Sequence, residues 1–289
     1  ITSIRSNKRR YTTMLAAGSL EGKRVLVTGG GSGLGAAMAT RFIELGANLV
    51  ICGRRLEVLQ AAASRWQQDL GAQVHIHRCD IRDAVQVESM MDSIWQDRPL
   101  DVLVNNAAAT FIARSEHLSH RAADAVLAPT LHGSMYCSLA AGRRWIEGKQ
   151  QGLILSILST STITGRAFTV PSAMAKSAVL AMTKSLAVEW GRYGVRLLAI
   201  APGSFPTPGA SAQLMAGKRS QLRAESRIPL GRVGEHAELA ELASFLLSDA
   251  AKFMTGEMVT IDGGAHLQSS GAEDLLTWTK QDWDELRKA

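Results

Sequence analysis

A serine and a lysine stand four residues apart in the segment Pro171-Ser172-Ala173-Met174-Ala175-Lys176. On a helix, residues at this spacing share one face, so the hydroxyl and the amine are expected to lie on the same side. Two uses are open. Ser172 and Lys176 resemble the nucleophile and base of a Ser–Lys hydrolase, or the lysine binds a cofactor. A dinucleotide site elsewhere in the chain favours the second use, because a hydrolase does not need one.

A glycine-rich turn is the clearest sign of a dinucleotide. Residues 28–35 read Thr-Gly-Gly-Gly-Ser-Gly-Leu-Gly and stand between a strand-like apolar run and a helical pattern. Glycines there can adopt positive φ and let backbone amides approach a pyrophosphate, which then lies at the positive end of the helix. At this place in the chain, the run predicts dinucleotide binding. The residues assigned to this role are Gly29, Gly31, Ser32, Gly33, Leu34 and Gly35.

The second expected strand ends in Gly53-Arg54-Arg55, where an acidic residue would hold the adenine ribose of NAD. A guanidinium there accepts the 2′-phosphate of NADP, whereas a carboxylate would repel it. Arg54 and Arg55 therefore favour NADP(H) as the cofactor. Two alternatives stay open: both arginines are solvated residues at the start of a helix, or Glu57 serves the ribose instead.

Two further strand ends carry residues suited to the same ligand. After the third strand, Asp80 is expected to face the adenine amino group, with Ile81 beside it. Asn106, Ala107 and Ala108 follow the fourth strand and are expected beside the ribose. Each is an ordinary loop residue on its own. Together with the glycine turn, they indicate one extended dinucleotide site.

The pattern of elements predicts how these residues are positioned. Strands are expected at 24–27, 47–52, 74–79, 101–105, 152–158, 195–201 and 258–261, and helices at 34–45, 55–70, 83–96, 120–147, 172–193 and 235–247. Such regular alternation is typical of a parallel sheet covered on both faces by helices. We therefore expect an α/β fold with a single Rossmann-type, doubly wound sheet.

One domain is enough for a chain of this length, since no linker or internal repeat divides it. The Rossmann-type domain is expected at 20–268, with a substrate loop at 203–230. A flexible basic tail at 1–19 is expected before it, and a C-terminal extension at 269–289 after it.

Composition narrows the classes of partner. The chain has 289 residues, 46% of them hydrophobic, and no apolar run approaches the ~18 residues of a membrane-spanning helix, so no membrane partner is expected. The net charge is +6, but four basic residues without an acid lie in the first nineteen positions. The positive charge therefore belongs mainly to this segment, and no nucleic-acid partner is expected.

The histidines lack ligand spacing with acidic partners, so no metal is expected. Three separated cysteines favour a cytoplasmic location, while the basic tail leaves organellar targeting open.

Over nearly its whole length, the chain resembles the short-chain dehydrogenase/reductase family. The resemblance rests on residues 28–35, Asp80, residues 105–108, Lys176, Pro202-Gly203 and the Asp-Gly-Gly at 262–264. It implies that Lys176 binds the nicotinamide ribose and that Pro202, Gly203 and Phe205 pass beside the nicotinamide carboxamide. It also implies a homotetramer, the common assembly of the family.

Within the family, the chain is most similar to the NADPH-dependent 2,4-dienoyl-CoA reductases. The similar segments are 28–35, 170–176, 186–191, 227–232 and 278–283. The similarity implies a small-molecule substrate, an acyl-CoA, with Arg82 matching a substrate-binding arginine and with Thr110 and Phe111 on the substrate side.

The sequence departs from these reductases at four positions. Ser161 and Thr110 stand where a tyrosine and an asparagine hold the thioester carbonyl, and Gln213 replaces an arginine that grips CoA. Thr130 replaces the usual family asparagine in the helix after the fourth strand.

Ser172 departs from the wider short-chain family, which usually has a tyrosine at this position. Reducing a ketone leaves an alkoxide, for which a phenol acidified by a lysine is the natural proton donor. Reducing a conjugated double bond instead relays the charge to a distant thioester oxygen, and this enolate needs hydrogen-bond donors. The catalytic candidates are Lys176, Ser172, Ser161 and Ser159, which precedes Ser172 by the family's thirteen residues; loop or capping roles are the alternative for Ser161 and Thr110.

Three functions therefore stay open. The first is an NADP-dependent reductase of enoyl or 2,4-dienoyl thioesters, acting in fatty acid metabolism. The second is a ketoreductase or alcohol dehydrogenase whose proton donor is not a tyrosine. The third is a member that binds NADP(H) without turnover, because its cofactor motifs are intact and the usual acid is missing.

Overall fold

In the computed structural model, the residues described are 15–209, 226–268 and 273–287. Within them, seven strands form one sheet in the order β3-β2-β1-β4-β5-β6-β7, and every pairing is parallel. The strands are β1 (Arg24–Thr28), β2 (Asn48–Gly53), β3 (His75–Arg78), β4 (Val102–Asn105), β5 (Gly152–Ile157), β6 (Val195–Pro202) and β7 (Met258–Ile261). The predicted α/β fold with a doubly wound sheet is confirmed.

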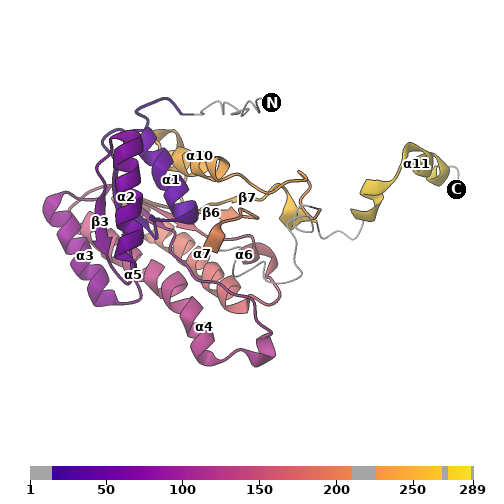
Figure 1. Cartoon of the computed structure of the whole chain (residues 1–289), viewed down its shortest axis with the longest axis horizontal. Coiled ribbons are helices and arrows are strands. Elements are labelled where there is room, and N and C mark those ends of the chain that lie inside the picture. The colour runs from indigo at the N-terminus through magenta and orange to yellow at the C-terminus, as the bar shows by residue number, and fades with distance from the viewer. Residues whose placement is uncertain (1–14, 210–225, 269–272, 288–289) are drawn as a thin grey trace, which may run out of the picture.

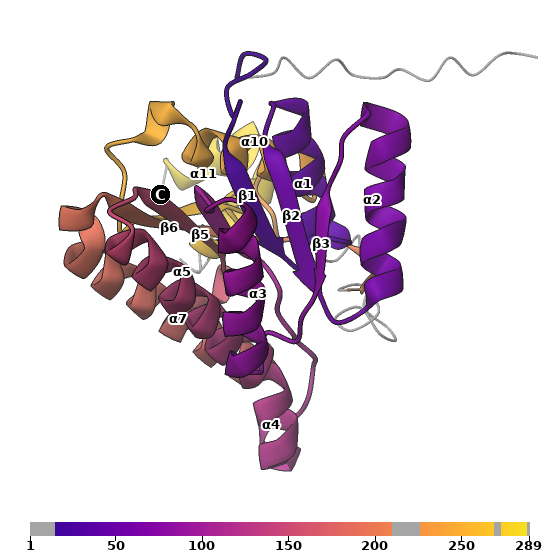
Figure 2. The same ribbon diagram turned by 90° about the vertical axis from the view of Figure 1, so that its left-hand side faces the viewer.

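Helices cover both faces of this sheet (Figures 1 and 2). Over one face lie α1 (Gly33–Glu44), α2 (Leu56–Leu70) and α10 (His236–Leu247), and over the other lie α3 (Ala84–Asp97), α5 (Gly133–Glu147) and α7 (Val170–Trp190). Phe42 and Trp66 fill the first layer of the core, and Met91 and Trp145 fill the second. The inner strands β1, β2, β4, β5 and β6 are mainly apolar and buried, as parallel strands covered on both sides must be, whereas the edge strand β3 is polar and partly exposed.

The predicted helix at 120–147 is interrupted. It consists of α4 (His120–Leu127), a π-helical turn (Ala128–His132) and α5. Pro129 lies in the turn, and because proline has no amide hydrogen it breaks the regular helical ladder. The expectation of one continuous helix was wrong here, since the hydrophobic spacing continues through the turn and hides it.

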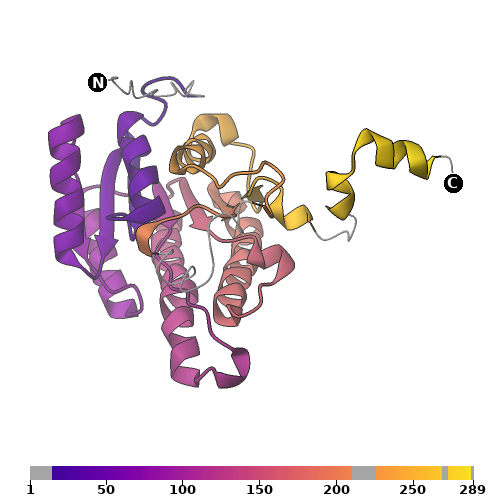
Figure 3. The same ribbon diagram turned by 45° about the vertical axis from the view of Figure 1, so that its right-hand side comes forward.

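Two short helices were not predicted. One is α6 (Ser161–Thr164), whose four residues are too few to show a helical period. The other is α11 (Lys280–Leu286) in the C-terminal extension, which begins with a reciprocal capping box between Thr279 and Asp282. Figures 1 and 3 show α11 standing off the body of the domain.

The packed region reaches back to Leu15, inside the segment expected as a tail. Leu15 packs against the α1 side of the core, and Leu20 is fully buried and donates its amide to the Leu45 carbonyl at 3.0 Å. The apolar residues of this turn therefore bind the end of α1, next to the predicted boundary at residue 19. None of the helices in the described part has the length and hydropathy needed to cross a bilayer.

Candidate cofactor site and active site

A cavity of about 730 Å³ opens where the strands end. Its walls include the following predicted cofactor residues: Gly29, Gly31, Ser32, Leu34, Gly35, Arg54, Arg55, Asp80, Ile81, Asn106, Ala107, Ala108, Lys176, Pro202 and Phe205. Gly33 and Gly203 are the two predicted cofactor residues that are not in its lining. Residues far apart in the chain are therefore brought to one cavity, as expected for a parallel sheet whose strands end at a common edge.

The glycine turn is built for close approach. Gly29 and Gly33 have φ angles of 66° and 55°, which favour glycine. A β-carbon on Gly35 would lie 2.5 Å from Nδ2 of Asn106 and 2.6 Å from the Gly29 carbonyl oxygen. Ser32 precedes α1 at the end of the helix that borders the cavity. The backbone amides of the first helical turn have no partner within the helix. The turn is thus shaped to present backbone amides to an anion.

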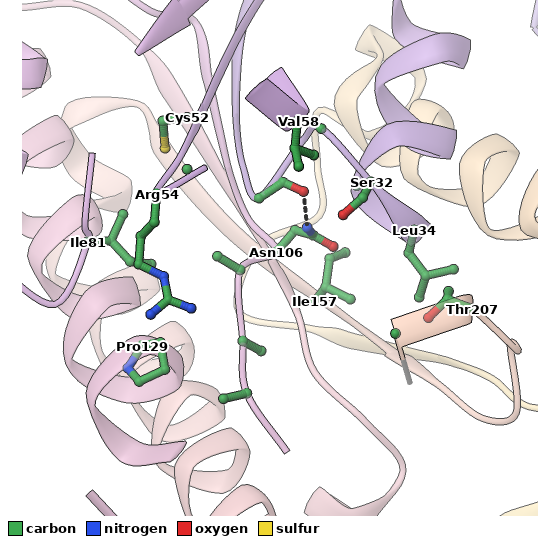
Figure 4. A pocket seen from close by; sticks show the side chains of 18 of the residues that line it. Ser32, Leu34, Cys52, Arg54, Val58, Ile81, Asn106, Pro129, Ile157 and Thr207 are labelled. Carbon is green, nitrogen blue, oxygen red and sulfur yellow. Dashed lines mark hydrogen bonds between the residues drawn. The ribbon is translucent and has the colours of Figure 1, made fainter. Parts of the chain in front are cut away.

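Hydrogen bonds join this turn to the end of β4. The Thr28 hydroxyl accepts from the backbone amides of Asn106 and Ala107, each at 3.0 Å. The Asn106 side-chain amide donates to the carbonyls of Thr28 at 2.9 Å and Gly29 at 3.4 Å. Figure 4 shows Asn106 between the glycine turn and the cavity. The asparagine therefore supports the turn, and the backbone beside it forms the cavity wall.

Two arginines occupy the end of β2. Arg54 and Arg55 are exposed, line the cavity, and make no ion pair among the described residues. Figure 4 shows the guanidinium of Arg54 beside Ile81 and Pro129. Glu57, the alternative ribose ligand, is exposed and is not a lining residue. The wall at this end therefore carries free positive charge.

Arg82 does not point into the cavity. Its guanidinium binds the carboxylate of Asp80, with Nε 2.9 and 3.0 Å from the two oxygens. This hydrogen bond from Arg82 is the main cause that lowers the pKa of Asp80. The substrate role of Arg82 stays a prediction, and the contact that the structure shows for this side chain is the one to Asp80.

Lys176 is the buried cation of the site. Its side chain leaves α7, is 8% exposed, lines the cavity, and donates Nζ to the Ile157 carbonyl at the end of β5. Burial lowers the pKa of Lys176 from 10.5 to about 8. A buried amine with this pKa can hold or release a proton near neutral pH.

The lowered pKa makes stability depend on pH. Between about pH 8 and pH 10.5, Lys176 binds fewer protons in the folded chain than in the unfolded chain. The free energy of unfolding is therefore expected to rise with pH across this window, by up to about 3 kcal/mol. Denaturant titrations of the wild type and Lys176→Met at both ends of the window measure the effect. An equal pH response in the two proteins would contradict the assignment.

Two of the three serines predicted to be catalytic lie together. Ser159 Oγ and Ser161 Oγ are 2.9 Å apart, and the Ser161 amide also donates to Ser159 Oγ at 3.1 Å. Ser161 is 6% exposed and begins α6. Ser172 is half-buried in the first turn of α7, and its hydroxyl has no hydrogen-bond partner among the described residues. None of the three lines the cavity.

The other substrate candidates lie next to the cavity wall rather than in it. Thr110 and Phe111 are half-buried and follow Ala109, which is a lining residue. Thr130, on the π-helical turn, accepts from the Ala109 amide at 3.1 Å. This threonine therefore fixes the path of the chain after β4. Gln213 lies outside the described residues.

The Pro-Gly and Asp-Gly-Gly motifs are in contact. Gly203 donates its amide to Ile261 at 2.9 Å, and a β-carbon on Gly203 would lie 2.4 Å from the Asp262 β-carbon. The glycine therefore packs against the end of β7, while Pro202 and Phe205 on either side reach the cavity.

Several lining residues were not predicted. They are Cys52, Gly53, Val58, Leu59, Cys79, Ala109, Pro129, Ile157, Leu158, Thr207 and Gly209. Most of them are apolar and carry no chemical signature in the sequence. Burial raises the pKa of the Cys79 thiol to about 11, so this thiol is neutral at physiological pH. No group of three or more potential metal ligands occurs in the described ranges.

Comparisons with known proteins agree with this geometry. The model of a family described as Enoyl-(Acyl carrier protein) reductase matches residues 29–266. A protein of Bacillus subtilis (strain 168) named probable 2,4-dienoyl-CoA reductase is 41% identical over 250 residues, covering 86% of this chain and 98% of that protein.

Two solved structures have the same fold. A short chain dehydrogenase from Bacillus anthracis is 40% identical with a TM-score of 0.77, covering 86% of this chain and 98% of that one. A gluconate 5-dehydrogenase from Beutenbergia cavernae, described as NAD(P) dependent and holding NADP at low occupancy, is 30% identical with a TM-score of 0.81, covering 88% and 100%. The chain therefore belongs to the short-chain dehydrogenase/reductase family, and is an oxidoreductase of the kind that uses a nicotinamide cofactor.

Proposed function

We propose that this oxidoreductase uses NADP(H) to reduce the double bond of an enoyl or 2,4-dienoyl thioester, with an acyl-CoA as its substrate. One observation carries the proposal: the residue four positions before Lys176 is Ser172, so a short hydroxyl and not a phenol stands at the position that precedes the buried cation on α7. The name of the Bacillus subtilis relative supports the same substrate class. A place in fatty acid metabolism follows from that substrate.

The residues present suit NADP(H). The glycine turn has no room for side chains at Gly35, and the end of α1 offers free amides to a pyrophosphate. Arg54 and Arg55, which form no ion pair with any other residue in the described ranges, offer guanidinium groups to a 2′-phosphate. When bound, the cofactor supplies the hydride. Lys176 and the small residues after β4 would hold its nicotinamide half.

The protein side of the reaction needs a cation and hydrogen-bond donors. Ser159 and Ser161 share one hydrogen bond between their hydroxyls, which leaves one O–H free to donate to an enolate oxygen. Lys176 Nζ, with a pKa of about 8, can pass a proton to water and recover it. A water molecule then protonates the carbon, so no tyrosine is required.

The test is a comparison of substrates. Purified protein is mixed with NADPH and crotonyl-CoA, hexadienoyl-CoA or acetoacetyl-CoA, and the loss of NADPH absorbance is followed. We expect oxidation with the unsaturated thioesters and none with the keto thioester. Activity with acetoacetyl-CoA alone would establish a ketoreductase instead, and silence with all three would establish a member that only binds the cofactor.

Replacing Ser172 by tyrosine is expected to create activity on acetoacetyl-CoA, because it restores a phenol beside Lys176.

Cofactor choice has its own test. Arg54→Asp replaces an attractive charge by a repulsive one, so NADPH binding is expected to weaken about 100-fold and NADH binding by less than about threefold. Dissociation constants from the fluorescence of the bound dinucleotides measure both values. Arg121→Asp, at an exposed position on α4, is the matched control. Equal losses for the two cofactors would reject the 2′-phosphate role.

The proposal also covers the organisation of the protein. We expect a cytoplasmic homotetramer in which the domain at 20–268, extended back to Leu15, carries the whole site. Met174 and Val188 are exposed apolar residues on α7, which supports a subunit contact through this helix. Light scattering of the purified protein gives the number of subunits directly.

A further inference from the structure

The side chain of Arg82 holds the carboxylate of Asp80. Besides the two bonds from Nε, its Nη2 lies 2.5 Å from Oδ2 of Asp80, and its backbone amide donates to Oδ1 at 3.1 Å. Two side-chain nitrogens and one amide of a single residue therefore hold one carboxylate. A planar guanidinium fits a carboxylate in this way, whereas a lysine does not.

The turn that carries this pair is fixed on its other side. The Asp80 amide donates to Gln86 Oε1 at 3.0 Å, and Gln86 Nε2 donates to Asp83 Oδ2 at 3.0 Å. Asp83 also caps α3 by accepting from the Val85 amide at 2.9 Å. The conformation between β3 and α3 is therefore set by several side chains, and Arg82 is the one whose guanidinium binds the carboxylate of Asp80.

That charge lies in the wall of the cofactor cavity. Asp80 is a lining residue together with Arg54, whereas Arg82 is not. Both arginines act on the carboxylate strongly enough to lower its pKa, so Asp80 is negative at any physiological pH. A negative group in this wall would repel the extra phosphate of NADP unless another charge compensates it.

We infer that Arg82 is a positioning residue for cofactor choice: it neutralises and holds Asp80, so that the end of the cavity at Arg54 stays positive. This inference rests on the proposed use of NADP(H). It assigns Arg82 to the cofactor side of the enzyme rather than to the acyl-CoA. The positive charge that meets the 2′-phosphate is then the sum of Arg54, Arg55 and the neutral Asp80–Arg82 pair.

The test measures binding without any acyl substrate. Dissociation constants for NADPH and NADH are determined for the wild type, Arg82→Ala, Asp80→Asn and the double variant. Arg82→Ala is expected to weaken NADPH binding about fivefold more than NADH binding, because the uncompensated carboxylate of Asp80 repels the extra phosphate. Adding Asp80→Asn should restore the wild-type preference, because the exposed carboxylate is gone. Arg82→Lys, which keeps the charge without the fork, should fall between wild type and Arg82→Ala.

Each other outcome has a definite meaning. Unchanged binding of both cofactors in Arg82→Ala would overturn the inference, and a raised KM for the acyl-CoA in a separate kinetic assay would then favour the substrate role. Equal weakening of NADPH and NADH that Asp80→Asn does not reverse would also overturn it, since the arginine would then only shape the turn. A wild type without preference for NADPH would contradict the proposed cofactor itself, whereas a preference that survives Arg82→Ala contradicts the inference alone.

Discussion

Replacing Lys176 by methionine is expected to lower kcat/KM for the unsaturated thioester by about 10²- to 10³-fold. Methionine is of similar length and fills the same space, but it carries no charge and no proton. The variant therefore loses the donor to the Ile157 carbonyl, the cation in the cavity wall, and the group that we propose to exchange protons with water. Three losses at one atom make this the largest expected effect on turnover.

The control is Lys184→Met, an exposed lysine two turns further along the same helix. It should keep kcat/KM within about twofold of the wild type, because the side chain does not line the cavity. Its free energy of unfolding should also change by no more than about 0.5 kcal/mol, as is usual for surface substitutions. Steady-state kinetics with NADPH in excess, together with thermal unfolding to confirm folding, measure both variants. A loss below tenfold in a folded Lys176→Met protein would remove Lys176 from the chemistry.

Gly35→Ala is expected to weaken the binding of NADPH by about 100-fold or more. The new methyl group would lie 2.5 Å from Nδ2 of Asn106, well inside van der Waals contact. Neither neighbour can move easily, since that nitrogen also donates to the Thr28 carbonyl and the other close atom is the backbone oxygen of Gly29. The backbone of the glycine turn must therefore shift, and its amides are no longer oriented to donate hydrogen bonds to the pyrophosphate.

Gly191→Ala is a matched control, because that glycine has no atom within 4 Å of the added β-carbon and does not need a positive φ. It should bind NADPH as the wild type does. Dissociation constants by isothermal calorimetry distinguish the two variants, and circular dichroism shows whether each keeps its helices. Wild-type affinity in Gly35→Ala would mean that the turn is not the pyrophosphate site.

Strands and helices with a regular hydrophobic pattern were predicted well. The strand at 258–261 has the same bounds in sequence and structure, and the helix that follows the glycine turn starts within one residue of its expected position. Both depend on local hydrophobic periodicity and on glycines at a fixed place in a βα unit. The convergence of Asp80, Asn106 and Lys176 on one cavity follows from the parallel order of the strands.

Contacts that depend on side-chain direction were not predictable in the same way. The sequence assigned Arg82 to the substrate, and only its rotamer shows that it turns back to Asp80. Likewise, the spacing of Ser159 and Ser161 does not say that their hydroxyls bond each other rather than a ligand. Pro129 reaches the cavity because a π-helical turn shifts the register of the helix, and this turn has no hydrophobic period of its own.

The Thr28 hydroxyl affects the specificity of dinucleotide binding. It fastens the end of β1 to the amides of Asn106 and Ala107, at the point where the strand order reverses. The two halves of the crevice are thus locked together when the chain folds, before any dinucleotide arrives. A preorganised crevice loses little conformational entropy on binding, so a dinucleotide that is too short or wrongly charged cannot recover its missing contacts by letting the halves rearrange.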